Sequence, residues 1–171
     1  MMLGALLLAA CHGDPPMVVT PQTGGPDMKE HLINANRTIA HSEETSIDEY
    51  VARRGWTMET LSNGSRVWEY QKGSGRQVAM EDSVRIRYSI EALNGKRLYD
   101  EMEERYVAGR RRDMVGLDEA VLALHYGSKA YVILPSALGY GIGGDGDRIP
   151  QSTVLVLKVE VKEANDFENK Q

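Results

Sequence analysis

Residues 129–161 read KAYVILPSALGYGIGGDGDRIPQSTVLVLKVEV and contain two strand patterns separated by a glycine-rich stretch. Residues 129–134 form an apolar run that Pro135 ends, because proline has no backbone N–H to donate to a neighbouring strand. Residues 154–161 alternate between two faces, which predicts a final strand. The glycines between the two strands favour a loop.

Further strand patterns precede this block. Residues 58–71 read as a hairpin around the turn Ser62-Asn63-Gly64-Ser65. Residues 84–90 alternate and predict a strand with one covered face. Asn94-Gly95 then makes a tight turn into a return strand that starts at Lys96.

One short helix is predicted at residues 114–124, and Gly127 is placed to end it. Its apolar residues form one stripe at helical spacing: Met114, Leu117, Val121 and Leu124. Strands and helices do not alternate along the chain, so a parallel sheet is not predicted. The expected fold class is α+β, with an antiparallel sheet wrapped around one short helix, because each element has one apolar face to cover.

The stretch quoted first resembles the signature of FKBP-type peptidyl-prolyl cis/trans isomerases. It contains Leu134-Pro135, then Tyr140-Gly141, a loop, Ile149-Pro150 and an apolar final strand. Upstream stretches resemble the same family in order and interval: residues 84–88, Asn94-Gly95-Lys96 with Tyr99-Asp100, and Met114-Val115-Gly116-Leu117. The resemblance covers about residues 58–163. It implies an FKBP-like fold and isomerase activity on proline-containing polypeptides.

The resemblance also implies a shallow apolar pocket that uses no cofactor and no metal. The floor and walls of this pocket would be Tyr88, Tyr99, Leu117 and Leu157. Ile149 would contact the proline ring, while the backbone N–H of Met114 and the hydroxyl of Tyr140 would hold substrate carbonyls. Asp100 would lie at the rim, hydrogen-bonded to a pocket tyrosine. Taken singly, each tyrosine also fits a plain core or half-buried surface position.

Three features depart from the family pattern. Leu117 stands where the family usually has Trp, and Leu157 stands where it often has Phe. One extra residue separates Lys96 from Tyr99-Asp100. A leucine floor is smaller than a tryptophan floor and has no N–H, which weakens the implied binding of macrolide inhibitors.

The implied reaction needs no reactive side chain. Rotation about a peptide bond has a barrier of about 18–20 kcal/mol, because the planar form is stabilised by resonance. For an X–Pro bond the two isomers differ by only about 0.5–1 kcal/mol, yet they exchange over tens to hundreds of seconds. No bond is made or broken, which agrees with a sequence whose four histidines are scattered: His12, His31, His41 and His125.

The loop at residues 141–147 is rich in glycine and contains Asp145 and Asp147. A phosphate-binding loop should open a helix, whereas Pro150 and a strand follow this one. Two aspartates supply too few oxygen ligands for a calcium loop. The expected role is a flexible loop that rims the pocket.

The N-terminus resembles a bacterial lipoprotein signal. Residues 1–10 read MMLGALLLAA, and Cys11 follows at once, as in a lipobox. This predicts a signal peptide over 1–10, lipidation of Cys11 and a Pro- and Gly-rich flexible tether over 11–28. Several acyl chains on Cys11 would anchor the protein stably in a membrane. No Lys or Arg precedes Cys11, so an ordinary secretory signal with a chance cysteine stays open.

Residues 29–55 predict a helical arm of one or two amphipathic helices. Ser46 fits the cap of a second helix that contains Ile47, Tyr50 and Val51. The arm could pack on the domain or form a homodimer. An isomerase domain over 56–163 and a polar tail over 164–171 complete the organisation. Lipobox and arm together resemble the lipoprotein branch of the family, which includes gliding-motility-associated members.

Composition limits the function classes. The net charge of −5 gives no electrostatic basis for nucleic-acid binding. The first hypothesis is an isomerase that assists the folding of exported proteins, lipid-anchored at the cell envelope and facing the periplasm or the cell exterior. The alternatives are a catalytically weak FKBP-like module that binds peptides, and a scaffold lipoprotein in which the arm carries the function.

Overall fold

The computed structural model describes residues 26–164. The predicted signal peptide, Cys11, most of the tether and residues 165–171 lie outside the described residues. The described elements in chain order are α1 (Pro26–Arg54), β1 (Glu59–Thr60), β2 (Arg66–Gln71), β3 (Ser83–Ala92), β4 (Arg97–Val107), α2 (Val115–Leu122), β5 (Lys129–Leu134), the 3-10 turns η1 (Ser136–Leu138) and η2 (Gly141–Gly143), and β6 (Leu155–Glu163).

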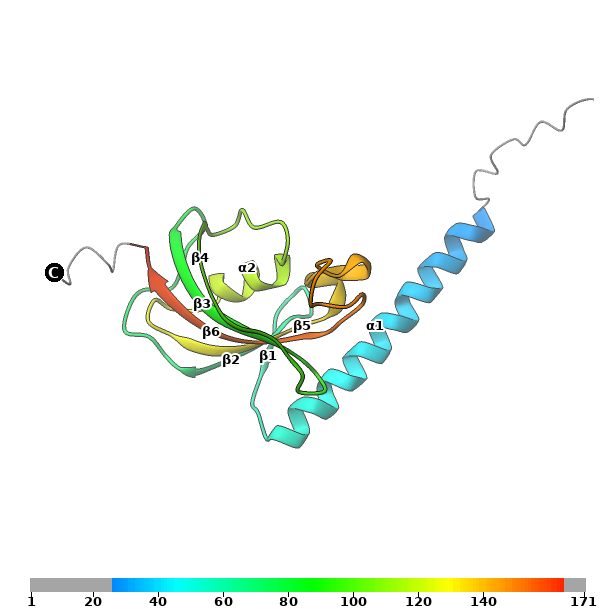
Figure 1. Ribbon diagram of the computed structural model, residues 1–171, viewed down its shortest axis with the longest axis horizontal. Helices are drawn as coiled ribbons and strands as arrows, with labels where there is room; N and C mark the ends of the chain where they lie inside the picture. Colours follow the sequence, from blue (N-terminus) through cyan, green and yellow to red (C-terminus); the bar gives the residue numbers. More distant parts are fainter. Residues whose placement is uncertain (1–25, 165–171) are drawn as a thin grey trace, which may run out of the picture. The chain divides into compact units, whose positions relative to one another are not determined.

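The strands form one six-stranded antiparallel sheet in the order β1-β2-β5-β6-β3-β4. Figure 1 shows that this sheet curves around α2. The α+β fold class predicted from the sequence is therefore confirmed. Residues 36–164 belong to one compact unit, and residues 26–35, which are helical, belong to another.

Strand β6 lies in the middle of the sheet, and its first part is covered on both faces. Because side chains alternate along a strand, Leu155, Leu157 and Val159 point toward α2, where at most 1% of their surface is exposed. Val154 and Val156 point the other way and belong to a second apolar cluster. The alternation read from the sequence therefore describes one buried face and an opposite face that is buried at Val154 and Val156 and exposed at Lys158.

The second cluster holds the C-terminal part of α1 on the sheet. Ile47 and Tyr50 from α1 pack with Ile133, Val154 and Val156 and are 1% and 3% exposed. These residues belong to the same compact unit as the sheet. The helical arm is therefore partly a structural element of the domain, because its apolar residues remove the outer face of β5 and β6 from water.

The details of both helices differ from the expectation. Helix α1 is continuous and begins at Pro26, where proline suits the first turn of a helix. Ser46 therefore caps no second helix, and its hydroxyl donates to the Ser42 carbonyl at 2.9 Å. Helix α2 ends at Leu122, so Gly127 does not end it. Gly127 instead has φ 86° in the turn before β5.

Both tryptophans and two tyrosines gather on the outer face of the sheet, away from α2. Trp56 and Tyr131 are stacked with their ring centroids 4.3 Å apart. Trp68 and Tyr70 lie beside the Tyr131 ring, with centroids 6.1 and 5.2 Å from it. Arg54 at the end of α1 lies 5.3 Å from the Trp56 ring centroid. These side chains extend the apolar cover of the outer face beyond α1.

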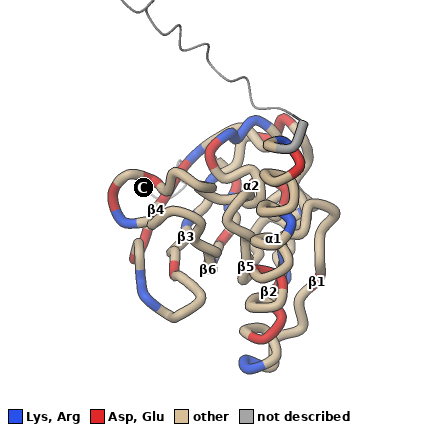
Figure 2. Tube along the Cα trace, turned by 90° about the vertical axis from the view of Figure 1, so that its right-hand side faces the viewer, with Lys and Arg blue, Asp and Glu red and all other residues tan. Residues whose placement is uncertain are grey.

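Basic and acidic residues are interspersed along the described chain (Figure 2). Arg97 pairs with Glu91 at 2.6 Å across β3 and β4, and Arg66 pairs with Asp48 of α1 at 3.1 Å. Within residues 26–164, no helix is long and apolar enough to cross a membrane.

We expect Ile47→Ala to lower the free energy of unfolding by about 2–5 kcal/mol, because it leaves a cavity against β5 and β6. Urea denaturation followed by tryptophan fluorescence measures the change. Ile39→Ala is the matched control on the same helix, since Ile39 is 46% exposed and should change stability by less than about 0.5 kcal/mol. Equal effects of the two variants would show that α1 does not pack as described.

Candidate active site

Seven of the eight site residues predicted from the sequence meet in one apolar cluster on the α2 side of the sheet. Those that are fully or almost fully buried are Tyr88, Met114, Leu117, Ile149 and Leu157. Tyr99 and Tyr140 are partly buried and pack against the same cluster. Because the residues come from β3, β4, β6, α2 and two loops, only the folded chain brings them together.

Asp100 is the exception, and the expectation that it binds a pocket tyrosine is wrong. It is exposed and lines a cavity of about 440 Å³ with Arg87 and Lys158, whose side chains alternate with those of the core. The reason is a register shift between β3 and β4, where Tyr88 pairs with Met102 but Ile90 pairs with Tyr99. A bulge of this kind turns the side chains beside it.

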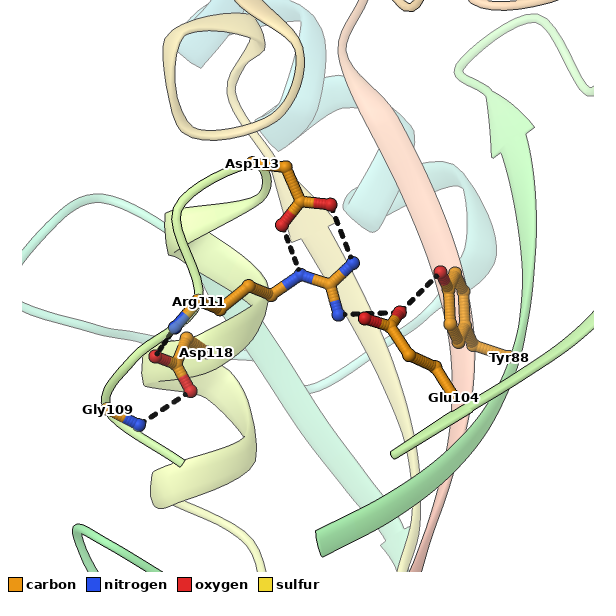
Figure 3. Close-up of polar contacts among 6 residues, drawn as sticks. All are labelled: Tyr88, Glu104, Gly109, Arg111, Asp113 and Asp118. Carbon is orange, nitrogen blue, oxygen red and sulfur yellow. Dashed lines mark hydrogen bonds and ion pairs between the residues drawn. The ribbon is translucent and has the colours of Figure 1, made fainter. Parts of the chain in front are cut away.

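Glu104 takes the position that had been expected for Asp100. The Tyr88 hydroxyl donates to the Glu104 carboxylate at 3.2 Å. Arg111 binds the same carboxylate at 2.9 Å and Asp113 at 2.8 Å (Figure 3). Only 3% of the Arg111 side chain is exposed, and its guanidinium lies 5.4 Å from the Tyr106 ring centroid. A buried cation with two carboxylates therefore lies beside the apolar cluster.

Asp118 holds the backbone that carries Arg111. Its carboxylate accepts hydrogen bonds from the backbone N–H groups of Gly109 at 3.0 Å and Arg111 at 3.1 Å (Figure 3). Asp118 is 6% exposed and lies in the first turn of α2. The helix therefore positions both the apolar Leu117 and, through its neighbour Asp118, the ionic group next to it.

The electrostatics of this group follow from burial and charge. Burial raises the pKa of Tyr88 to about 12, so its hydroxyl stays a donor at neutral pH. Burial acts to lower the pKa of Arg111, but Glu104 and Asp113 outweigh it and raise that pKa. Arg111 is therefore positively charged at every pH used to measure activity or stability.

Asp145 organises the loop that carries Ile149. One of its carboxylate oxygens accepts from the Ile149 N–H at 2.8 Å and the Asp147 N–H at 2.9 Å. The other accepts from the Tyr99 hydroxyl at 2.5 Å. Gly144 is required before it, because it has φ 66° and a Cβ there would lie 2.3 Å from the Ile149 carbonyl oxygen. The loop expected to be flexible is therefore tied to Tyr99 at the edge of the cluster.

Two hydrogen-bond donors at the cluster are unused. Among the described residues, neither the backbone N–H of Met114 nor the hydroxyl of Tyr140 makes a hydrogen bond. Met114 directly precedes α2, where the helix dipole places partial positive charge. These are the two groups that the resemblance assigned to substrate carbonyls.

The floor of the predicted pocket is closed in this structure. Met114, Leu117 and Leu157 have no exposed surface. A proline ring is larger than a water molecule, so it reaches these residues only after a covering side chain moves. Tyr140 is partly exposed and packs against the cluster, as do Tyr99, Met102 and Tyr106. The charges of Asp113 and Arg111 act on the Tyr140 hydroxyl.

Sequence reasoning missed the polar residues of this site. They are Glu104, Arg111, Asp113, Asp118 and Asp145. The run Arg110-Arg111-Arg112-Asp113 before a predicted helix was a visible signal, because a cluster of charges next to an apolar stripe is unusual on a plain surface. Glu104 and Asp118 carried no such signal, since acidic residues are common on strands and in first helical turns.

We expect the loop to lose its anchor in acid. Burial would raise the pKa of Asp145, but hydrogen bonds from Tyr99 and from backbone N–H groups outweigh burial and lower that pKa. The unfolded chain has an Asp pKa of about 3.9, so the stabilisation is present above about pH 4 and is lost as pH falls through the lower folded pKa. Asp145→Asn should therefore destabilise the protein at pH 7 and show a flatter decline below pH 4.

Urea denaturation between pH 2 and pH 7 measures this difference. The control is Asp147→Asn, because the Asp147 side chain is 72% exposed and should change stability at pH 7 by less than about 0.5 kcal/mol. Parallel pH profiles for Asp145→Asn and the wild type would show that the loop is not held by this carboxylate.

Known proteins resemble this chain in sequence. A family model for FKBP-type peptidyl-prolyl cis-trans isomerases matches residues 74–162. FK506-binding protein 2 of Dictyostelium discoideum is 34% identical over 85 residues, which are 47% of this chain and 63% of that protein. A probable FKBP-type 25 kDa peptidyl-prolyl cis-trans isomerase of Pseudomonas aeruginosa is 29% identical over 101 residues, 59% of this chain and 44% of that protein. The chain thus spans less than two thirds of these relatives.

Solved structures share the fold. The peptidyl-prolyl cis-trans isomerase from Pseudomonas syringae has a TM-score of 0.61 at 24% identity and covers 74% of this chain and 92% of its own. FkpA from Escherichia coli has a TM-score of 0.60 at 22% identity and covers 80% of this chain and 66% of its own. Since the family model covers just over half of the sequence and the structure has the matching fold, this chain belongs to the FKBP-type peptidyl-prolyl cis-trans isomerase family.

Proposed function

We propose that this chain catalyses cis/trans isomerisation of X–Pro bonds in polypeptides at the apolar cluster around Leu117. One observation carries the proposal. Buried apolar residues from separate elements meet beside two unused donors, the Met114 N–H and the Tyr140 hydroxyl. This is the arrangement that a reaction without bond making or breaking requires.

The cluster can favour the transition state over the ground state. A planar amide has separated charge, and the twisted amide has less, so an apolar surface free of water favours the twisted form relative to water. The two donors hold the carbonyls on either side of the bond while the proline turns. Ile149, fixed by Asp145, limits where the ring can lie. Only interactions that are stronger in the twisted state accelerate the reaction.

We expect Tyr140 or Arg111 to move when the substrate enters, since Leu117 and Leu157 are fully covered, Tyr140 packs against their cluster and Arg111 pairs with Glu104 beside it. Glu104 and Asp113 can remain paired with Arg111 during such a movement, because their own side chains are 36% and 51% exposed. The Arg111 guanidinium can therefore move toward the rim of the site and stay paired with Glu104 and Asp113.

Acceleration of isomerisation in short X–Pro peptides, measured on protein lacking residues 1–25, tests the proposal. We expect Tyr140→Phe to lower kcat/KM by about fivefold or more, because one hydrogen bond of about 1 kcal/mol is lost in the transition state. Asp100→Ala is the matched control and should keep full activity, since Asp100 faces away from the cluster. If folded protein accelerates no peptide, whatever residue precedes proline, the enzyme proposal is wrong.

One specific observation supports a second candidate function. The closed floor and the small Leu117 side chain are compatible with an FKBP-like module that binds peptides or serves as a scaffold with little catalysis. In that case a proline peptide would bind, and Tyr140→Phe would weaken binding, without any acceleration of isomerisation by the wild type.

We also propose that the protein is a lipoprotein of the cell envelope, facing the periplasm or the cell exterior, where it assists exported proteins. The support is the apolar run of residues 1–10 followed directly by Cys11 and a Pro-rich stretch, as in lipoproteins of the gliding-motility-associated type. A homodimer through the arm is part of this proposal, because Met28, Leu32 and Ile33 are exposed apolar residues.

Metabolic labelling with radioactive palmitate tests the anchor. We expect label on the wild-type protein in the membrane fraction of a bacterial host and none on Cys11→Ser, because the thiol is the only cysteine in the chain. Ser42→Ala serves as a control for expression. Unlabelled wild-type protein, exported at normal levels, would contradict the lipid anchor.

A further inference from the structure

An apolar groove of about 690 Å³ lies between α1 and the segment 135–152. Its walls include Ile39, Ala40 and Ile47 from α1, and Pro135, Leu138 and Ile142 from the other side. Ile39 is 46% exposed and Ile142 is 84% exposed. Large aliphatic side chains this exposed, on both sides of one groove, mark a surface that can cover apolar groups of a partner.

The groove is built into the folded domain. The Glu43 carboxylate of α1 accepts hydrogen bonds from the Ser136 N–H at 2.9 Å and the Ser136 hydroxyl at 2.6 Å. On the same side, Arg66 of β2 pairs with Asp48 of α1 at 3.1 Å. All of these residues belong to one compact unit. The two walls are therefore held in place before any partner binds.

One wall of the groove is continuous with the candidate active site. Tyr140 directly precedes η2 and packs against the apolar cluster, and Gly141 and Ile142 within η2 line the groove. Two residues of chain span at most about 7 Å. A polypeptide with its proline beside Tyr140 therefore needs only a few further residues to reach Ile142 and the groove.

We propose that this groove binds apolar side chains of the same unfolded polypeptide whose X–Pro bond lies at the active site. The inference rests on the proposed isomerase function. Each extended residue spans about 3.3–3.6 Å, so a substrate that runs from Tyr140 toward Ile142 brings side chains a few positions from the proline to the groove. The groove thus selects unfolded, apolar chains over short peptides, which end before they reach it.

The test uses the double variant Ile39→Gln/Ile142→Gln in the full chain. Glutamine keeps the side-chain length, suits a helix and removes the apolar surface. Met80→Gln is the matched control, because Met80 is 60% exposed in a loop that does not line the groove. Isomerisation is measured on an X–Pro tetrapeptide and on an unfolded protein whose refolding is limited by a prolyl bond.

We expect the double variant to keep tetrapeptide kcat/KM within about twofold and to lose about tenfold on the unfolded protein, since two aliphatic contacts are removed. Met80→Gln should change neither value. Equal losses on both substrates, or no loss on either, would overturn the proposal. So would a change in the sedimentation of the double variant with unchanged activity, since the groove would then be an interface with a second copy.

Binding separates this proposal from the isomerase function. The dissociation constant for a permanently unfolded, reduced and carboxymethylated protein is measured by fluorescence anisotropy. One outcome is that the wild type accelerates no tetrapeptide while the double variant binds this probe about tenfold more weakly than the wild type does. In that case the isomerase proposal is wrong and the groove still binds unfolded polypeptide. Undiminished binding by the double variant would overturn the groove as well.

Discussion

The structure depends on the burial of the first part of strand β6 on both faces. Leu155, Leu157 and Val159 on one face require α2 to cover them, and Val154 and Val156 on the other require α1. Because successive side chains of a strand alternate, the same backbone sets the position of both helices. The core cluster and the packing of the arm thus both follow from one stretch of alternating apolar residues. Removal of either α1 or α2 would expose a central strand to water.

The covered inner face also determines where charge can lie. Arg111 is buried beside the cluster, and a buried guanidinium is tolerated only with partners. Glu104 and Asp113 neutralise it, and Asp118 fixes its backbone. Asp145 likewise holds the loop that carries Ile149, because its carboxylate accepts hydrogen bonds from the Tyr99 hydroxyl and the Ile149 N–H. The apolar site is therefore framed by carboxylates, each of which holds a particular segment in place.

The distribution of aromatic residues changes how the site is understood. A tryptophan floor is replaced by Leu117, whereas both tryptophans of the chain, Trp56 and Trp68, lie on the outer face of the sheet. The site offers a smaller apolar surface and two unused donors, and its floor is covered. The proposed isomerase would gain from contacts outside the small pocket, and the groove between α1 and η2 lies where such contacts can form.

Much of the fold was predictable because it follows from local patterns. Alternation located β3 and β6, and an apolar run ended by Pro135 located β5. The turn Asn94-Gly95 located a hairpin, and one apolar stripe located α2. The residues Tyr88, Leu117, Tyr140, Ile149 and Leu157 pack in one apolar cluster, and their shared role in a site stays a prediction. The continuity of α1 was not predictable in the same way, since Ser46 is an equally good cap or mid-helix residue when its packing is unknown.

Only the tertiary structure decided which polar side chains pair with one another and which distant segments form one surface. The register shift between β3 and β4 turns Asp100 outward and leaves Glu104 to bind Tyr88, and such a shift depends on how two strands pair. The burial of Arg111 depends on Asp118 and on the loop that it holds. The sequence by itself determined which residues are apolar and how they alternate, because that periodicity is local. It could not determine which charge meets which, because side chains far apart in the chain become neighbours only when the sheet closes around α2.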